Sequence, residues 1–112
     1  MPSHADPALS ATYHGCMDKA GGATASMLEC MDQEYRLLDS RLNAAYQTLL
    51  MHHTGPRKLQ LRDAQRTWLK FRDANCSYYA DPDGGSLARV IGSDCLLTVT
   101  AARVDELEGL LQ

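Results

Sequence analysis

The sequence predicts an all-α fold, a three-helix bundle built on a long antiparallel helical hairpin and cross-linked by two disulfides. Three observations lead to this prediction. Apolar residues recur at spacings of three and four over long stretches, as on one face of a helix. Two short clusters of helix-breaking residues, 52–56 and 81–86, separate these stretches. Four cysteines occur in 112 residues, and no two of them form a CxxC pair.

The first predicted helix covers residues 24–52. No Gly or Pro interrupts residues 24–54, and the apolar side chains form one continuous stripe that can face a core. Gly55 can adopt the left-handed conformation that ends a helix, and Pro56 cannot continue one. The stripe consists of Met27, Leu28, Met31, Tyr35, Leu38, Leu42, Ala45 and Leu49.

The second predicted helix covers residues 57–80. Because a short turn between two long helices makes an antiparallel hairpin, we expect the two apolar stripes to face each other. Trp68 and Phe71 lie on the second stripe and are expected in the core. Folding the hairpin about residue 54 also predicts a partly buried Asp39–Arg72 pair and a contact of Asn43 with Gln65 or Arg66.

A third helix is predicted over residues 94–111, with Ser93 or Asp94 as its N-cap. The segment 87–94 is ambiguous. Residues 1–15 are expected to be an irregular, partly disordered arm that precedes a helical domain of residues 16–112, because Pro and Gly interrupt this part of the chain. Residues 1–12 lack the basic and apolar regions of a signal peptide.

Composition and motifs exclude several classes of function. The net charge is −3, which argues against a nucleic-acid partner. No apolar run approaches the ~18 residues of a membrane span. No GxSxG, HExxH or P-loop motif is present, so we expect no enzymatic activity and no cofactor. The cysteine and histidine spacings match no common metal site, so no metal is expected.

One segment has a specific pattern, residues 61–76 (LRDAQRTWLKFRDANC). Glu29-Cys30 precedes it, and Cys95-Leu96 and Arg103 follow it. In this order and spacing the chain resembles the LprI-like lysozyme-inhibitor family of bacterial envelope proteins, from about Cys16 to Leu111. The resemblance implies a secreted or periplasmic, disulfide-bearing helical domain that inhibits lysozyme. The alternative is an envelope structural or interaction domain, or a toxin-immunity protein, with no affinity for lysozyme.

An inhibitor of this kind would bind a protein and block it without chemistry. The turn residues Asp81, Asp83, Gly84, Gly85 and Ser86 are the candidate contacts, because they combine backbone donors and a hydroxyl with little bulk. Vertebrate lysozymes are basic, so acidic residues at one end of the bundle would steer association. Those residues are Glu29, Asp32, Glu34, Asp81, Asp83 and Asp94.

The predicted disulfides are Cys16–Cys30 and Cys76–Cys95. The hairpin brings Cys30, Cys76 and Cys95 to one end of the bundle, so geometry alone leaves Cys30–Cys76 with Cys16–Cys95 open. Each local pairing closes a short loop that contains Gly. Some members of the resembled family also look to carry only the first two cysteines, which favours a bond between those two.

Overall fold

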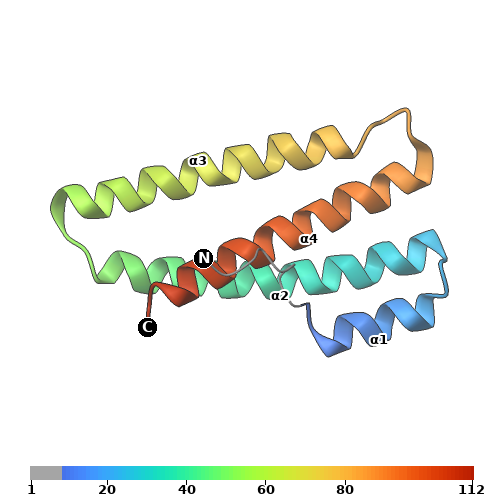
Figure 1. The fold of residues 1–112 in the computed structure, drawn as a ribbon, viewed down its shortest axis with the longest axis horizontal. Helices are drawn as coiled ribbons and strands as arrows, with labels where there is room; N and C mark the ends of the chain where they lie inside the picture. Colours follow the sequence, from blue (N-terminus) through green and yellow to red (C-terminus); the bar gives the residue numbers. More distant parts are fainter. Residues whose placement is uncertain (1–8) are drawn as a thin grey trace, which may run out of the picture.

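A computed structural model describes residues 9–112, and in this part of the chain it contains helices and no strand (Figure 1). The helices are α1 (Ala11–Ala20), α2 (Thr24–Met51), α3 (Gly55–Tyr79) and α4 (Gly85–Gly109). The molecule is elongated, with extents of 49 × 30 × 27 Å. The all-α prediction is confirmed, and α2 and α3 begin and end within two residues of their predicted bounds.

Helix α4 is the centre of the bundle. Helices α2 and α3 run in opposite directions, but both pack mainly on α4 and make little contact with each other (Figure 1). The expectation that the α2 and α3 stripes face each other is therefore wrong. The physical reason is that α4 offers apolar side chains over much of its circumference, so both neighbouring helices bury more surface against it.

Helix α4 also begins earlier than predicted, at Gly85 rather than near Asp94. Ser93 and Asp94 lie inside the helix, so the N-cap prediction is wrong. The ambiguous segment 87–94 forms the first turns of α4, because Ala88 and Gly92 are buried there. A Cβ on Gly92 would lie 2.5 Å from the Cβ of Ala80, so α3 and α4 approach closely at this point.

Helix α1 occupies part of the expected irregular arm. Ser10 caps it by accepting a hydrogen bond from the Tyr13 N–H at 3.0 Å, and it ends at Gly21 with a φ of +57°. The prediction of irregular chain is therefore wrong for residues 11–15, and residues 1–8 lie outside the described part. A serine at the N-cap and a glycine at the C-cap are common at the two ends of a helix, so Ser10 and Gly21 are the local signals for α1.

The apolar core lies between α2 and α4, and Tyr13 of α1 closes one side of it. Helix α3 buries a different face from the one expected, formed by Gln65, Arg72 and Cys76. Trp68 is half-buried at the core margin, and Phe71 is 60% exposed. The core prediction for Phe71 is wrong because α3 turns Arg72, one residue further on, toward its neighbours. The fully buried side chains include Leu42, Leu97, Thr100, Val104 and Leu107.

Within residues 9–112, no helix has both the length and the apolar character that crossing a membrane requires.

Candidate protein-binding surface

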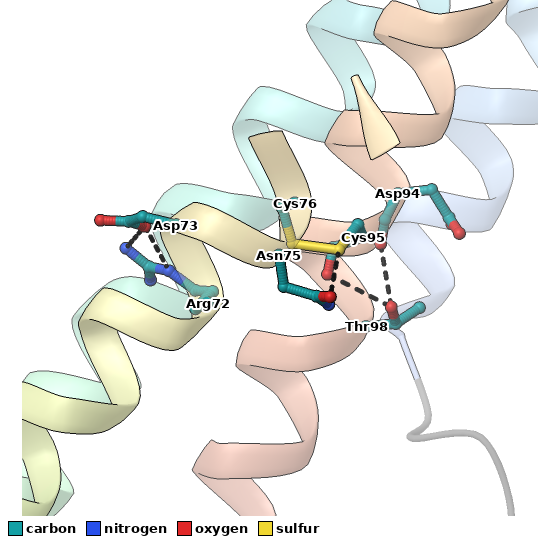
Figure 2. Close-up of a disulfide and its surroundings, with 7 residues drawn as sticks. All are labelled: Arg72, Asp73, Asn75, Cys76, Asp94, Cys95 and Thr98. Atoms are coloured by element: carbon teal, nitrogen blue, oxygen red, sulfur yellow. Dashed lines mark hydrogen bonds and ion pairs between the residues drawn. A yellow bond between two sulfur atoms is a disulfide. The ribbon is translucent and has the colours of Figure 1, made fainter. Parts of the chain in front are cut away.

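Two disulfides connect neighbouring helices. Cys16 of α1 bonds to Cys30 of α2, and Cys76 of α3 bonds to Cys95 of α4, with Cα–Cα distances of 5.8 and 5.4 Å. This is the predicted pairing, and the alternative through Cys30–Cys76 is not formed. Figure 2 shows the second disulfide between the end of α3 and the first half of α4.

The candidate contact residues of the α3–α4 turn all lie on the surface. The Asp81 carboxylate accepts a hydrogen bond from the Asp83 N–H at 2.9 Å, and the Gly84 N–H donates to the Asp81 carbonyl at 3.0 Å. The turn is therefore ordered by its own hydrogen bonds. Gly85, with a φ of +68°, begins α4. The Gly84 N–H is already used, which leaves the Gly85 and Ser86 N–H groups at the start of the helix.

The acidic end of the bundle is smaller than the sequence suggests, because Glu34 is buried. Its carboxylate accepts hydrogen bonds from the backbone N–H and the hydroxyl of Ser10, both at 2.7 Å. Glu34 therefore connects α2 to the start of α1 and is only 5% exposed. Burial, followed by the nearby carboxylates of Asp94 and Glu34, raises the pKa of Tyr13. The acidic residues that remain on this part of the surface are Glu29, Asp32, Asp81, Asp83 and Asp94.

Arg72 is a central residue of the 61–76 segment, but its partner is not Asp39. Its guanidinium group pairs with Asp73 at 3.0 Å and lies 5.6 Å from the Tyr35 ring and 5.3 Å from the Trp68 ring. Asp39 instead accepts a hydrogen bond from Asn43 at 3.4 Å. The predicted Asp39–Arg72 pair is therefore not formed, because α2 and α3 pack on α4 and the aromatic rings occupy the space beside Arg72.

Gln65 has a partner on α4. The Arg103 guanidinium donates to the Gln65 side-chain oxygen at 3.0 Å and lies 5.8 Å from the Trp68 ring. The predicted contacts of Asn43 with Gln65 or Arg66 are thus replaced by Gln65–Arg103. Tyr35, Trp68, Arg72 and Arg103 form one aromatic and cationic stack across three helices. This stack holds the bundle together and leaves these side chains little surface for a partner.

A groove that the sequence analysis missed lies between α3 and α4, next to the turn. It has a volume of about 310 Å³ and is lined by Asn75, Tyr79, Ile91, Asp94, Cys95, Thr98 and Val99. Figure 2 shows Asn75 and Thr98 near the Cys76–Cys95 disulfide, and Asn75 donates to the Cys95 sulfur at 3.9 Å. The missed signal is the spacing of Leu87, Ile91 and Asp94, which places the three on one face once the helix begins at Gly85.

No group of three or more potential metal ligands occurs among the residues of the described part. A larger groove of about 550 Å³ lies where α4 meets the ends of α2 and α3, and Asp73 and Arg89 are its charged residues. The surface thus offers grooves and an acidic turn, which suit the binding of another protein.

Comparison with known proteins places this small, disulfide-linked helical domain in a family. Residues 16–107 match the family model described as Lysozyme inhibitor LprI. The chain belongs to the LprI lysozyme inhibitor family, a family of inhibitors rather than enzymes. It is also similar to an uncharacterized protein of Rhizobium meliloti (strain 1021), with 30% identity over 97 residues, 74% of this chain and 70% of that protein. No solved structure matches the chain. The family and the disulfides fit an extracytoplasmic location.

Proposed function

We propose that this protein is a secreted or periplasmic inhibitor that binds lysozyme-type peptidoglycan hydrolases and blocks their cleft without performing chemistry. The family match over residues 16–107 is the observation that carries the proposal. The disulfides support it, because disulfides form and persist in oxidising compartments and stabilise domains too small to bury a large core.

The α3–α4 turn is the part of the surface that we assign to the cleft. Asp81 and Asp83 are exposed. The hydrogen bond from the Asp83 N–H to the Asp81 carboxylate orders the turn before a partner binds. The nearby Cys76–Cys95 disulfide joins the two helices that support it. A preordered contact loses less conformational entropy on binding, which favours affinity.

Two kinds of group in the turn suit a lysozyme. Its acidic side chains attract a basic enzyme over a distance of about one Debye length. At the start of α4, the Gly85 and Ser86 N–H groups have no acceptor within the helix, and the catalytic carboxylates of a glycosidase are suitable acceptors. The expected complex therefore places the start of α4 at the mouth of the cleft.

A cell-wall lysis assay tests this proposal. Equimolar protein should slow the lysis of bacterial cell walls by a vertebrate-type lysozyme. An Asp81→Asn/Asp83→Asn variant should inhibit less well, whereas a control with the same change in net charge, Asp63→Asn/Asp105→Asn, should inhibit like the parent. Lysis at the full rate in the presence of the parent protein would contradict the proposal.

A further inference from the structure

We infer that the exposed surface beside the turn docks a basic protein face, and that a lysine or arginine of that partner enters the groove between α3 and α4. We name this surface the α3–α4 face, formed by Tyr78, Tyr79, Leu87, Ile91 and Asp94. The inference rests on the proposed function for the identity of the partner. It adds which surface makes the contact and which side-chain chemistry it accepts.

Large apolar side chains are exposed on the α3–α4 face. Tyr78 is 79% exposed, Tyr79 49%, Leu87 67% and Ile91 43%, all within one turn and the helix ends that it joins. The two tyrosine rings contact each other edge to face, with their centroids 5.6 Å apart. Tyrosine combines a large contact area with few rotatable bonds, and it is enriched at protein interfaces. A cluster of this kind marks an interaction site rather than scattered surface residues.

The groove on this face is held in shape by covalent and steric contacts. Cys95 lines it, and the bond from Cys95 to Cys76 joins the two helices that form its walls (Figure 2). A few residues away, Gly92 and Ala80 bring the helix backbones together too closely for an added methyl group. The walls are therefore not free to collapse on each other or to separate, and the groove exists before binding.

The charge of the groove selects a cation. Asp94 is the one charged residue among those that line it, and it takes part in none of the ion pairs of the described residues. Asp81 and Asp83 add negative charge at the turn next to it. The nearest arginine along α4, Arg89, lines the other groove instead. An incoming lysine or arginine can lay its aliphatic stem on Tyr79 and Ile91 while its charged end approaches Asp94.

A second copy of the chain is a poorer occupant. A two-fold dimer through this face would bring Asp81, Asp83 and Asp94 of both copies together, and like charges in an interface oppose association. The net charge of −3 acts in the same direction. A basic partner gains from the same three carboxylates.

Binding of a vertebrate-type lysozyme, measured by calorimetry at low and high salt, tests the inference. The apolar variant is Tyr78→Ser/Leu87→Ser, and its matched control is Met51→Ser/Leu59→Ser, which removes exposed apolar side chains at the opposite end of the bundle. The charge variant is Asp94→Asn, with Asp105→Asn as its control. All the substituted residues are exposed, so each variant should fold like the parent. Thermal unfolding of each variant checks this.

We expect the apolar variant to bind about tenfold more weakly or worse, and the Met51→Ser/Leu59→Ser control to stay within about twofold of the parent. Asp94→Asn should weaken binding at low salt and reduce its salt dependence, whereas Asp105→Asn should not.

If the apolar and charge variants bind like the parent, the docking surface is wrong while the proposed function stands. If the parent binds without inhibiting and both the apolar and the charge variant lose binding, the docking surface is supported and inhibition is not. If the parent does not bind the enzyme, both fail. Dimerisation of the parent that the apolar variant abolishes would show that a second copy covers the face.

Discussion

Glu34 shows how one residue can change the interpretation of a surface. It lies in an acidic stretch of α2, yet its carboxylate is buried. This carboxylate accepts hydrogen bonds from both the N–H and the hydroxyl of Ser10. Hydrogen bonds to a charged acceptor are stronger than neutral ones, and an orphaned buried donor costs free energy. The same pair places a negative charge at the positive end of α1.

Replacing Glu34 with alanine should therefore lower the free energy of unfolding by about 1–3 kcal/mol, because the N–H and the hydroxyl of Ser10 both lose their acceptor. The exposed Glu29 is the matched control on the same helix, and Glu29→Ala should change stability by no more than about 0.5 kcal/mol. Urea unfolding followed by circular dichroism measures both. Equal effects of the two substitutions would show that the Ser10 contact contributes nothing.

A second residue pair predicts a dependence on pH. Arg41 of α2 and Glu108 of α4 form two contacts, of 2.6 and 3.2 Å, and this bond lowers the pKa of the Glu108 carboxyl. A lowered folded-state pKa gives stability that is present above the unfolded value of about 4.5 and is lost as the pH falls through the folded value. Because both side chains are more than one-third exposed, the contribution stays near 0.2–1 kcal/mol.

Glu108→Gln should accordingly be slightly less stable than the parent at pH 7, and the difference should disappear in acid below the folded-state pKa of Glu108. Thermal unfolding at a series of pH values measures the difference directly. A difference that persists unchanged to pH 2 would mean that it comes from packing and not from the ion pair.

At the scale of elements, the approach of α3 to α4 depends on small residues. The added Cβ of an alanine at 92 would meet the Cβ of Ala80 at 2.5 Å and its Cα at 3.2 Å, so the helices would have to separate. Alanine favours a helix over glycine by about 1 kcal/mol, but overpacking costs about 1–3 kcal/mol. At this site the overpacking cost is the larger of the two, because the atoms that would have to move include the backbone Cα of Ala80.

We expect Gly92→Ala to reduce stability by up to about 2 kcal/mol, the overpacking cost of about 1–3 kcal/mol less the gain of about 1 kcal/mol in helix propensity. Gly15→Ala is the matched control, since Gly15 lies within α1 and an added Cβ there meets nothing within 4 Å. That control should stabilise the protein by about 0.5–1 kcal/mol. Chemical denaturation compares the two, and stabilisation by both substitutions would contradict the close approach.

At the scale of the whole molecule, the two disulfides have different neighbours. Each closes a short loop, with sequence separations of 14 and 19, and each should contribute about 3 kcal/mol in the chain-entropy model. Cys16–Cys30 joins α1 to α2 and does not involve either helix that supports the α3–α4 turn. Cys76–Cys95 holds the α3–α4 face, so its loss should also loosen the proposed contact surface.

Removal of Cys76–Cys95 by double serine substitution should therefore lower both stability and hydrolase binding. Removal of Cys16–Cys30 should lower stability by a similar amount, about 3 kcal/mol, and leave the binding of the folded fraction almost unchanged. Unfolding and calorimetry on the two double variants measure these effects, at a temperature where both remain folded. Equal loss of binding in both would mean that global stability, and not the shape of this face, controls association.

The sequence by itself determined the helical class, the positions of α2 and α3 and the turn between residues 81 and 86. Periodicity and helix-breaking residues are local properties, so Gly55, Pro56 and the 81–86 cluster mark helix ends whatever packs around them. The short loops that contain Gly, together with the family resemblance, favoured the local disulfides, and the structure shows that these are the pairs that form. The resemblance to the family is also visible in the sequence alone, in the segment 61–76 and the residues around it, and the family match covers residues 16–107.

Only the tertiary structure decided which helix faces meet. The periodicity of α3 is compatible with burying Trp68 and Phe71, but packing on α4 turns Gln65, Arg72 and Cys76 inward and leaves Phe71 exposed. The close approach of α3 to α4 depends on the fit of Gly92 against Ala80, and the role of Glu34 depends on Ser10, 24 residues away. The groove beside Asp94 exists because α3 packs on α4 rather than on α2. These features are long-range contacts, and no local pattern of residues specifies them.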